Sequence, residues 1–154
     1  MNQTAQTEPL IIYLACPYSH ESESIRKFRF TQANYAAGHL AGKGYGVMSP
    51  ISQGHPIAET GLAAGDWETW AAVDKRMIDA ADAVVVLDIP GLSKSEGVRA
   101  EVAYAIEKGK TLAVMAPLVP DVYAYKHDDE AVLFLLHKLG LPVAQSELPG
   151  VVNG

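Results

Sequence analysis

The sequence is poor in features that define several large classes of proteins. Its 154 residues include one cysteine, Cys16, so no disulfide can form within the chain, and we expect a reducing, cytoplasmic location. No apolar run approaches the roughly 20 residues that a helix needs to cross a bilayer. The first nine residues lack the cationic start of a signal peptide. We therefore expect neither a membrane segment nor export.

Positive charge is also scarce. Lysine and arginine number 12 against 18 aspartates and glutamates, a formal net charge of −6, and no basic cluster is longer than Arg26-Lys27. Polynucleotides are held by basic patches, so we expect no nucleic-acid partner. A single phosphate needs only one or two cations or helix amides, which leaves a small phosphorylated ligand open. Arg26 and Arg29 are expected mainly on the solvated face of a helix.

Motifs for common cofactors and metals are missing as well. No Gly-x-Gly-x-x-Gly follows the first expected strand, and no Walker loop opens a helix. Cys16, His20 and His55 can be drawn together as zinc ligands, but the paired Cys/His spacing of zinc sites is absent. We expect no cofactor and no metal.

Buried strands alternate with helices along the chain. The length and a hydrophobic content of 49% suit one core, and continuous apolar strands indicate a parallel sheet. We predict an α/β, Rossmann-like or flavodoxin-like three-layer sandwich with a parallel sheet of four to five strands. Strands are expected at 10–15, 46–49, 83–87 and 111–115, and helices at 24–43, 67–80, 98–109 and 130–139.

One domain is expected at 10–143. Residues 1–9 read as a frayed N-terminal segment, and 144–154 as a weakly specified tail. Residues 51–66 are rich in Gly, Pro, Ser and His and read as a loop longer than an ordinary connection. A binding role or a lid is the hypothesis for this loop.

The stretch 81–110 organises the rest of the chain. A buried strand is followed by a loop containing Pro90, Gly91 and Gly97, and then by a small apolar helix that carries Glu101. Open α/β sheets bind ligands at the carboxyl ends of their strands. A carboxylate there, near the positive end of a helix, is expected to stay ionised. Glu101 is therefore a candidate site residue.

Several short motifs occur together in one order. They are Leu14-Ala15-Cys16-Pro17-Tyr18, Asp74, the apolar run 81–86, and Ser95-x-Gly97-x-x-x-Glu101-x-x-Tyr104-Ala105. In this order the chain resembles the nucleoside 2-deoxyribosyltransferase superfamily over about residues 10–115. More narrowly, it is similar to a small bacterial branch with Ser-Pro-Ile-x-x-x-His, here 49–55, and Trp-x-x-Trp before the aspartate.

The resemblance implies cleavage or transfer at the N-glycosidic bond of nucleosides or nucleotides. Glu101 matches the nucleophile, and Asp74 matches an aspartate that contacts the base and protonates the leaving nitrogen. Breaking this bond builds positive charge on the sugar, which a close carboxylate stabilises or captures. A proton donor must itself be protonated, so the pKa of Asp74 is expected to be raised by burial or by Glu101.

Two departures from the family pattern bear on the reaction. Ser95 stands where the transferases carry an aspartate, and Arg99 where many members have glycine. A serine before a helix start at Gly97 is what the family's nucleoside 5′-monophosphate hydrolases use to hold phosphate. We therefore expect hydrolysis of a nucleoside 5′-monophosphate, with release of free base. A helix cap is the structural alternative for Ser95.

The remaining candidates lie on loops near the strand ends. Substrate contacts are expected from Tyr18, His20, His55, Asp88 and Arg99. Tyr13 is expected to pack inside the sheet, and Asp82 to be a structural turn residue.

Three alternatives stay open. The first is a transferase that moves deoxyribose between bases. The second is a phosphoribohydrolase or NAD-cleaving enzyme, although the Pro-Gly-Gly-x-Gly-Thr motif of the phosphoribohydrolases is absent. The third is a non-catalytic nucleotide-binding module, favoured if Glu101 faces away from the pocket. Apolar helix faces further predict a homodimer or a higher homo-oligomer.

Overall fold

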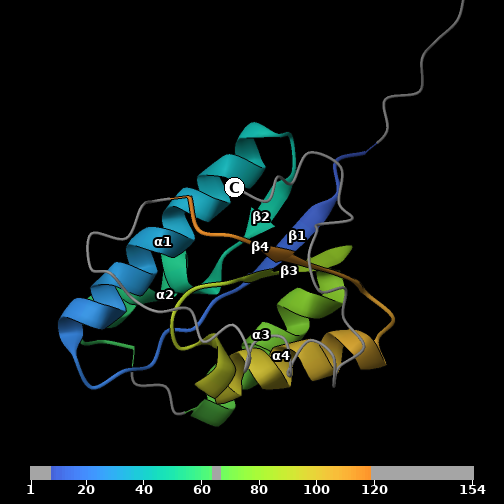
Figure 1. Cartoon of the computed structure of the whole chain (residues 1–154). Coiled ribbons are helices and arrows are strands. Elements are labelled where there is room, and N and C mark those ends of the chain that lie inside the picture. The colour runs from blue at the N-terminus through green and yellow to red at the C-terminus, as the bar shows by residue number, and fades with distance from the viewer. Residues whose placement is uncertain (1–7, 64–66, 119–154) are drawn as a thin grey trace, which may run out of the picture.

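The computed structural model describes residues 8–63 and 67–118 of the chain. A four-stranded sheet lies between two layers of helices (Figure 1). In chain order the elements are β1 (Ile11–Ala15), α1 (Glu23–Gly42), β2 (Gly46–Met48), α2 (Pro50–Glu59), α3 (Trp67–Ala80), β3 (Ala83–Leu87), the short 3-10 helix η1 (Leu92–Lys94), α4 (Glu96–Glu107) and β4 (Thr111–Met115).

All four strands are parallel, in the order β2-β1-β3-β4. Parallel strands need crossover helices, and these cover both faces. Helices α1 and α2 lie on one side of the sheet, and α3 and α4 on the other (Figure 1). The predicted α/β three-layer fold with a parallel sheet is therefore confirmed.

Alternate residues of β1 supply the two halves of the core. Ile12 and Leu14 join the apolar cluster beneath α1, whereas Tyr13 and Ala15 join the cluster beneath α3 and α4. All four side chains are buried. Successive side chains of a strand point to opposite faces, so a strand covered on both faces must be apolar throughout.

The topology places a switch point between β1 and β3. From β1 the chain first crosses through α1 to β2 on one side, and later returns through α3 to β3 on the other. The carboxyl ends of β1 and β3 therefore carry loops that diverge to opposite faces. This switch point is where open α/β sheets bind their ligands.

The segment after β2 differs from its prediction. Residues 51–66 were expected to form a loop, but Pro50–Glu59 is helix α2. Proline suits the first turn of a helix because its fixed φ is already helical. Ile51 packs against the core and His55 is buried. Gly54 and Pro56 are poor helix formers, which hid α2 in the sequence, and tertiary packing outweighs their cost.

The other predicted strands and helices within the described residues begin and end within two residues of their expected bounds. Of the frayed segment predicted at 1–9, residues 1–7 lie outside the described residues, as do the predicted helix at 130–139 and the tail at 144–154. Across 8–63 and 67–118, no helix is long and apolar enough to cross a membrane.

Asp82 has the structural role expected of it. Its carboxylate accepts a hydrogen bond from the Ile11 N–H at 2.7 Å, and its own N–H donates to the Ile11 carbonyl at 2.8 Å. These two hydrogen bonds join the amino-terminal ends of β1 and β3, away from the carboxyl ends that carry the switch point.

Candidate active site

The turn from β3 to α4 positions the candidate nucleophile. Ser95 caps α4, because its Oγ accepts a hydrogen bond from the Val98 N–H at 3.2 Å. Gly91 earlier in this loop has φ of +94°, a left-handed conformation that favours glycine. From the cap, α4 carries Glu101 as its sixth residue, in the second turn of the helix.

Two carboxyl groups meet between α3 and α4. Asp74 and Glu101 line one small pocket, together with Ala71, Lys75 and Ala100. The two alanines leave room in which the longer carboxyl side chains face the pocket. Both predicted catalytic residues are partly buried and open to the same space. We call Asp74 and Glu101 the inner carboxyl pair.

The hydroxyl of Tyr13 lies close enough to interact with both carboxyl groups. The side chain comes from β1 and is fully buried. Its hydroxyl influences the charge of both Glu101 and Asp74, yet no described group meets it with the geometry of a hydrogen bond. Tyr13 was expected only to pack inside the sheet. It does pack there, but its polar end belongs to the candidate site.

Burial dominates the electrostatics of the inner carboxyl pair. It raises the pKa of Glu101 to about 8, with a further rise from nearby Asp74 and a smaller opposing effect of the Tyr13 hydroxyl. It raises the pKa of Asp74 to about 6, again opposed by Tyr13. Burial and the two carboxylates also raise the pKa of Tyr13. The rise expected for Asp74 is therefore present.

The expectation that Glu101 stays ionised is wrong for the free protein. The favourable field at a helix N-terminus falls off within the first turn, and Glu101 lies beyond it. Desolvation and the neighbouring carboxylate both disfavour its charge. Two interacting carboxyl groups titrate as a unit, so the pair carries one proton between its two pKa values. A pair in this state holds one acid and one base.

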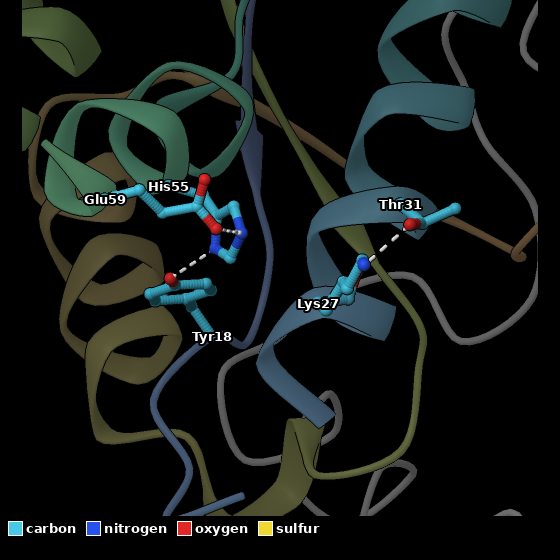
Figure 2. Close-up of polar contacts among 5 residues, drawn as sticks. All are labelled: Tyr18, Lys27, Thr31, His55 and Glu59. Carbon is cyan, nitrogen blue, oxygen red and sulfur yellow. Dashed lines mark hydrogen bonds and ion pairs between the residues drawn. The ribbon is translucent and has the colours of Figure 1, made fainter. Parts of the chain in front are cut away.

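A second group lies beyond the carboxyl end of β1. The Tyr18 hydroxyl is 2.6 Å from Nδ1 of His55, joining the β1 loop to α2 (Figure 2). Phe30 of α1 stacks on the His55 ring, with centroids 4.3 Å apart and planes inclined by 23°. Two predicted substrate contacts, from distant parts of the sequence, thus touch each other.

Comparison with known proteins identifies a family. Residues 10–117 match the family described as "Domain of unknown function (DUF1937)". The chain belongs to this family. No curated protein sequence matches it. A solved structure titled "2-desoxiribosyltransferase from Leishmania mexicana" is similar, with a TM-score of 0.49, 22% identity, and coverage of 93% of this chain and 81% of that one.

The other predicted contacts of this DUF1937 domain lie on its loops and helix ends. His20 is exposed and accepts a hydrogen bond from the Ser22 N–H at 2.9 Å. Arg99 of α4 is exposed, and its guanidinium donates to the Ser93 carbonyl at 3.2 Å, in the short helix η1 that precedes α4. Asp88 is partly buried at the end of β3.

Arg29 of the DUF1937 domain holds the two loops of the switch point together. Its guanidinium donates to the Ser19 carbonyl at 2.8 Å and to the Pro90 carbonyl at 3.4 Å, and the side chain is 8% exposed. A Cβ on Gly91 would lie only 2.3 Å from this guanidinium, so a larger residue there would force the Arg29 side chain to move. Arg29 was expected on a solvated face; no local sequence signal reveals two carbonyl partners in separate loops.

Proposed function

We propose that this chain is an N-glycosidase that hydrolyses a nucleoside 5′-monophosphate and releases the free base. The observation that carries the proposal is the inner carboxyl pair, in which Asp74 and Glu101 open to one pocket. The resemblance of the chain's motifs to nucleoside 2-deoxyribosyltransferases supports the same chemistry. A non-catalytic module would be favoured by a Glu101 that faces away from the pocket, and Glu101 lines it.

In the proposed reaction the Glu101 carboxylate attacks the anomeric carbon while the bond to the base nitrogen breaks. Asp74 gives its proton to that nitrogen, so the base leaves neutral. Water then attacks the glycosyl ester, gives a proton to the Asp74 carboxylate and frees Glu101. The two steps together consume one water and yield the free base and the sugar phosphate.

The scheme requires the inner carboxyl pair to move one proton, because in the free protein that proton lies mainly on Glu101, the group with the higher pKa. Between the pKa of Asp74, about 6, and that of Glu101, about 8, the pair holds a single proton. The reaction needs that proton on Asp74 and a charge on Glu101. Positive charge developing on the sugar favours this arrangement, because it stabilises an adjacent carboxylate in the transition state.

The proposed phosphate site is the start of α4. Ser95 accepts a hydrogen bond from Val98 and keeps its own O–H to donate. The amides of the first turn, which include that of Gly97, and the positive end of this 12-residue helix favour an anion. Arg99, His20 and Asp88 are proposed as outer contacts to the substrate.

A panel of nucleosides and their 5′-monophosphates, assayed for free base by chromatography, tests the proposal. We expect release from at least one monophosphate, and slower release from the matching nucleoside. Ser95→Ala should lower kcat/KM for the monophosphate roughly tenfold, and that for the nucleoside much less. Absence of release across the whole panel would contradict the function. Equal losses on both substrates would contradict only the phosphate site.

A second base as acceptor distinguishes hydrolysis from transfer. The same inner carboxyl pair serves either acceptor, so transferase activity is the competing form of this proposal. Wild-type protein is incubated with a substrate and an excess of a different free base. We expect sugar phosphate to accumulate without a new nucleotide; a new nucleoside or nucleotide would assign the transferase.

We also propose a homodimer. Val73 and Ile106 are apolar yet 42% and 41% exposed, and they lie on α3 and α4, the helices that hold the pocket. A partner covering these side chains would remove apolar surface from water and narrow the pocket. Light scattering at assay concentration tests this. A fully active monomer would contradict it.

A further inference from the structure

The hydrogen bond between Tyr18 and His55 continues to a carboxylate. Nε2 of His55 is 3.2 Å from Oε1 of Glu59, one turn further along α2 (Figure 2). The ring itself is only 8% exposed and is stacked on Phe30, whereas the Glu59 side chain is largely exposed. A buried imidazole is thus held at both nitrogens, from inside by a hydroxyl and from outside by a carboxylate.

These partners determine where the protons lie. A neutral imidazole has one N–H and one bare nitrogen. A carboxylate only accepts, so Glu59 selects the tautomer with the proton on Nε2. Nδ1 is then the acceptor, and the Tyr18 hydroxyl must donate its proton to it. The hydroxyl proton is used up in this bond, and the lone pairs of the Tyr18 oxygen remain free.

We propose that Tyr18 is a hydrogen-bond acceptor for a hydroxyl or amino group of the substrate, and that His55, held by Glu59, is the positioning residue that keeps it in this role. The inference rests on the proposed function and extends it to specificity. A carbonyl oxygen in the same place would meet the lone pairs of Tyr18 without a proton between them, so the site discriminates between donor and acceptor groups.

The position of Tyr18 connects it to the inner carboxyl pair. It lies on the loop that leaves the carboxyl end of β1, the strand that also carries Tyr13. Burial raises the pKa of Cys16, two residues earlier, to about 12; Arg29 opposes this rise and Glu101 adds to it. Glu101 is therefore near enough to the start of this loop to act on Cys16 electrostatically.

Kinetics with matched substrates tests the role of Tyr18. Pairs that differ by amino against carbonyl on the base, or by a hydroxyl against hydrogen on the sugar, are compared for base release. Tyr18→Phe should lower kcat/KM for the donor-bearing member of one pair about three- to tenfold and leave the other member within twofold. Equal losses on both members of every pair would overturn the inference while leaving the proposed function intact. No release by the wild type would instead reject the function, and this inference with it.

Variants of His55 separate positioning from simple packing. His55→Phe keeps the stacked ring but removes the acceptor, and His55→Asn restores an acceptor near the position of Nδ1. We expect His55→Phe to reduce the preference for the donor-bearing substrate as much as Tyr18→Phe does. The double variant should lose no more than either single variant. His55→Asn should keep part of the preference that His55→Phe loses. Thr31→Val is the control, because it removes a hydrogen bond to the Lys27 carbonyl on the same helix, apart from this group (Figure 2). Additive losses in the double variant would overturn the positioning role.

Nitrogen NMR of the histidine ring tests the proton arrangement without any substrate. We expect His55 in the wild type to be neutral with its proton on Nε2. Glu59→Gln, whose amide can donate to Nε2, should shift the ring toward the Nδ1–H tautomer, whereas the exposed control Glu23→Gln should not. A wild-type ring with the proton on Nδ1 would overturn the inference.

Discussion

Helices α3 and α4 meet at two places that use similar groups in opposite ways. At the inner carboxyl pair, Asp74 faces Glu101 over the buried Tyr13 hydroxyl. At the outer contact, which we define as Asp79 and Tyr104, the hydroxyl donates to the carboxylate at 2.6 Å in an exposed position. At the inner place, no described residue meets the Tyr13 hydroxyl with full hydrogen-bond geometry, whereas at the outer place the Tyr104 hydroxyl forms a short hydrogen bond to a carboxylate.

The surroundings explain the difference. Two lysines lie over the outer contact, where Lys108 and Lys75, which also lines the inner pocket, each place Nζ 5.4 Å from the Tyr104 ring centroid. Lys110 donates to the Asp79 carbonyl at 3.0 Å. Burial instead raises the pKa of both inner carboxyls. The Asp79 carboxylate, stabilised by water and nearby lysines, forms a structural link between the helices. The inner carboxyl groups are desolvated, and their raised pKa values suit them for proton transfer and nucleophilic attack.

The largest expected effect follows removal of the inner nucleophile. Glu101→Gln should lower base release roughly a thousandfold or more, because an amide cannot form the glycosyl ester. Glu107→Gln, an exposed change on the same helix, is the control and should stay within twofold. Both rates are measured by chromatography. Near-normal base release by Glu101→Gln would contradict a catalytic role for the inner carboxyl pair.

The stability of the same variant excludes a trivial loss of fold. The folded pKa of Glu101, about 8, lies above its ordinary value of 4.5, so wild-type stability declines as pH rises through this interval. Glutamine has no charge to desolvate. Glu101→Gln should therefore melt at or above the wild-type temperature, with the advantage growing up to about pH 8. A clearly lower Tm would point to a structural role.

The next effect concerns the proton. Asp74→Asn should lower kcat/KM roughly a hundredfold on ordinary substrates, because the leaving base loses its proton donor. A glycoside with an activated leaving group needs no proton and should lose far less. Asp79→Asn is the matched control on the same helix and should leave both rates nearly unchanged. Equal losses on both kinds of substrate would reject Asp74 as the acid.

A smaller effect is expected from Tyr13→Phe. The hydroxyl lowers the pKa of both inner carboxyls, so its removal should shift the activity profile toward alkaline pH and lower kcat/KM near neutrality about three- to tenfold. Because no described residue meets this hydroxyl with the full geometry of a hydrogen bond, its loss should change Tm little. A large drop in Tm with an unshifted profile would assign Tyr13 to packing alone.

The smallest effect belongs to the outer contact. Tyr104→Phe removes an exposed hydrogen bond to Asp79 and should lower Tm by a few degrees at most, without a change in kcat/KM. Calorimetry and the base-release assay measure the two quantities. A loss of activity comparable to that of Tyr13→Phe would show that the two contacts are not functionally distinct.

Much of the fold could be predicted because it follows local patterns. Continuous apolar runs such as Ala83–Leu87 identify buried parallel strands, and helical spacing identifies α3 and α4. The placement of Asp74 and Glu101 at one pocket was also expected, through the resemblance. Asp74 and Glu101 come close because α3 and α4, the helices before and after β3, pack on the same side of the sheet (Figure 1).

The remaining features depend on contacts that no local pattern records. Helix α2 contains Gly54 and Pro56 and persists through packing. The role of the Tyr13 hydroxyl depends on which face of β1 packs against α3 and α4, which the sequence does not show. The one sequence signal for this role is that Tyr13 is the single polar-tipped side chain in an apolar strand. Arg29 is buried because two loop carbonyls, far apart in sequence, converge on it. The ionisation of Glu101 depends on burial that only the assembled helices create.

The dependence of kcat/KM on pH tests the inner carboxyl pair most directly. If Asp74 and Glu101 work as one unit, the singly protonated form is active, and the profile should be a bell with limbs near the two pKa values, about 6 and about 8. Asp74→Asn should abolish the bell and leave a single limb. A wild-type rate that stays constant through this range would contradict the account.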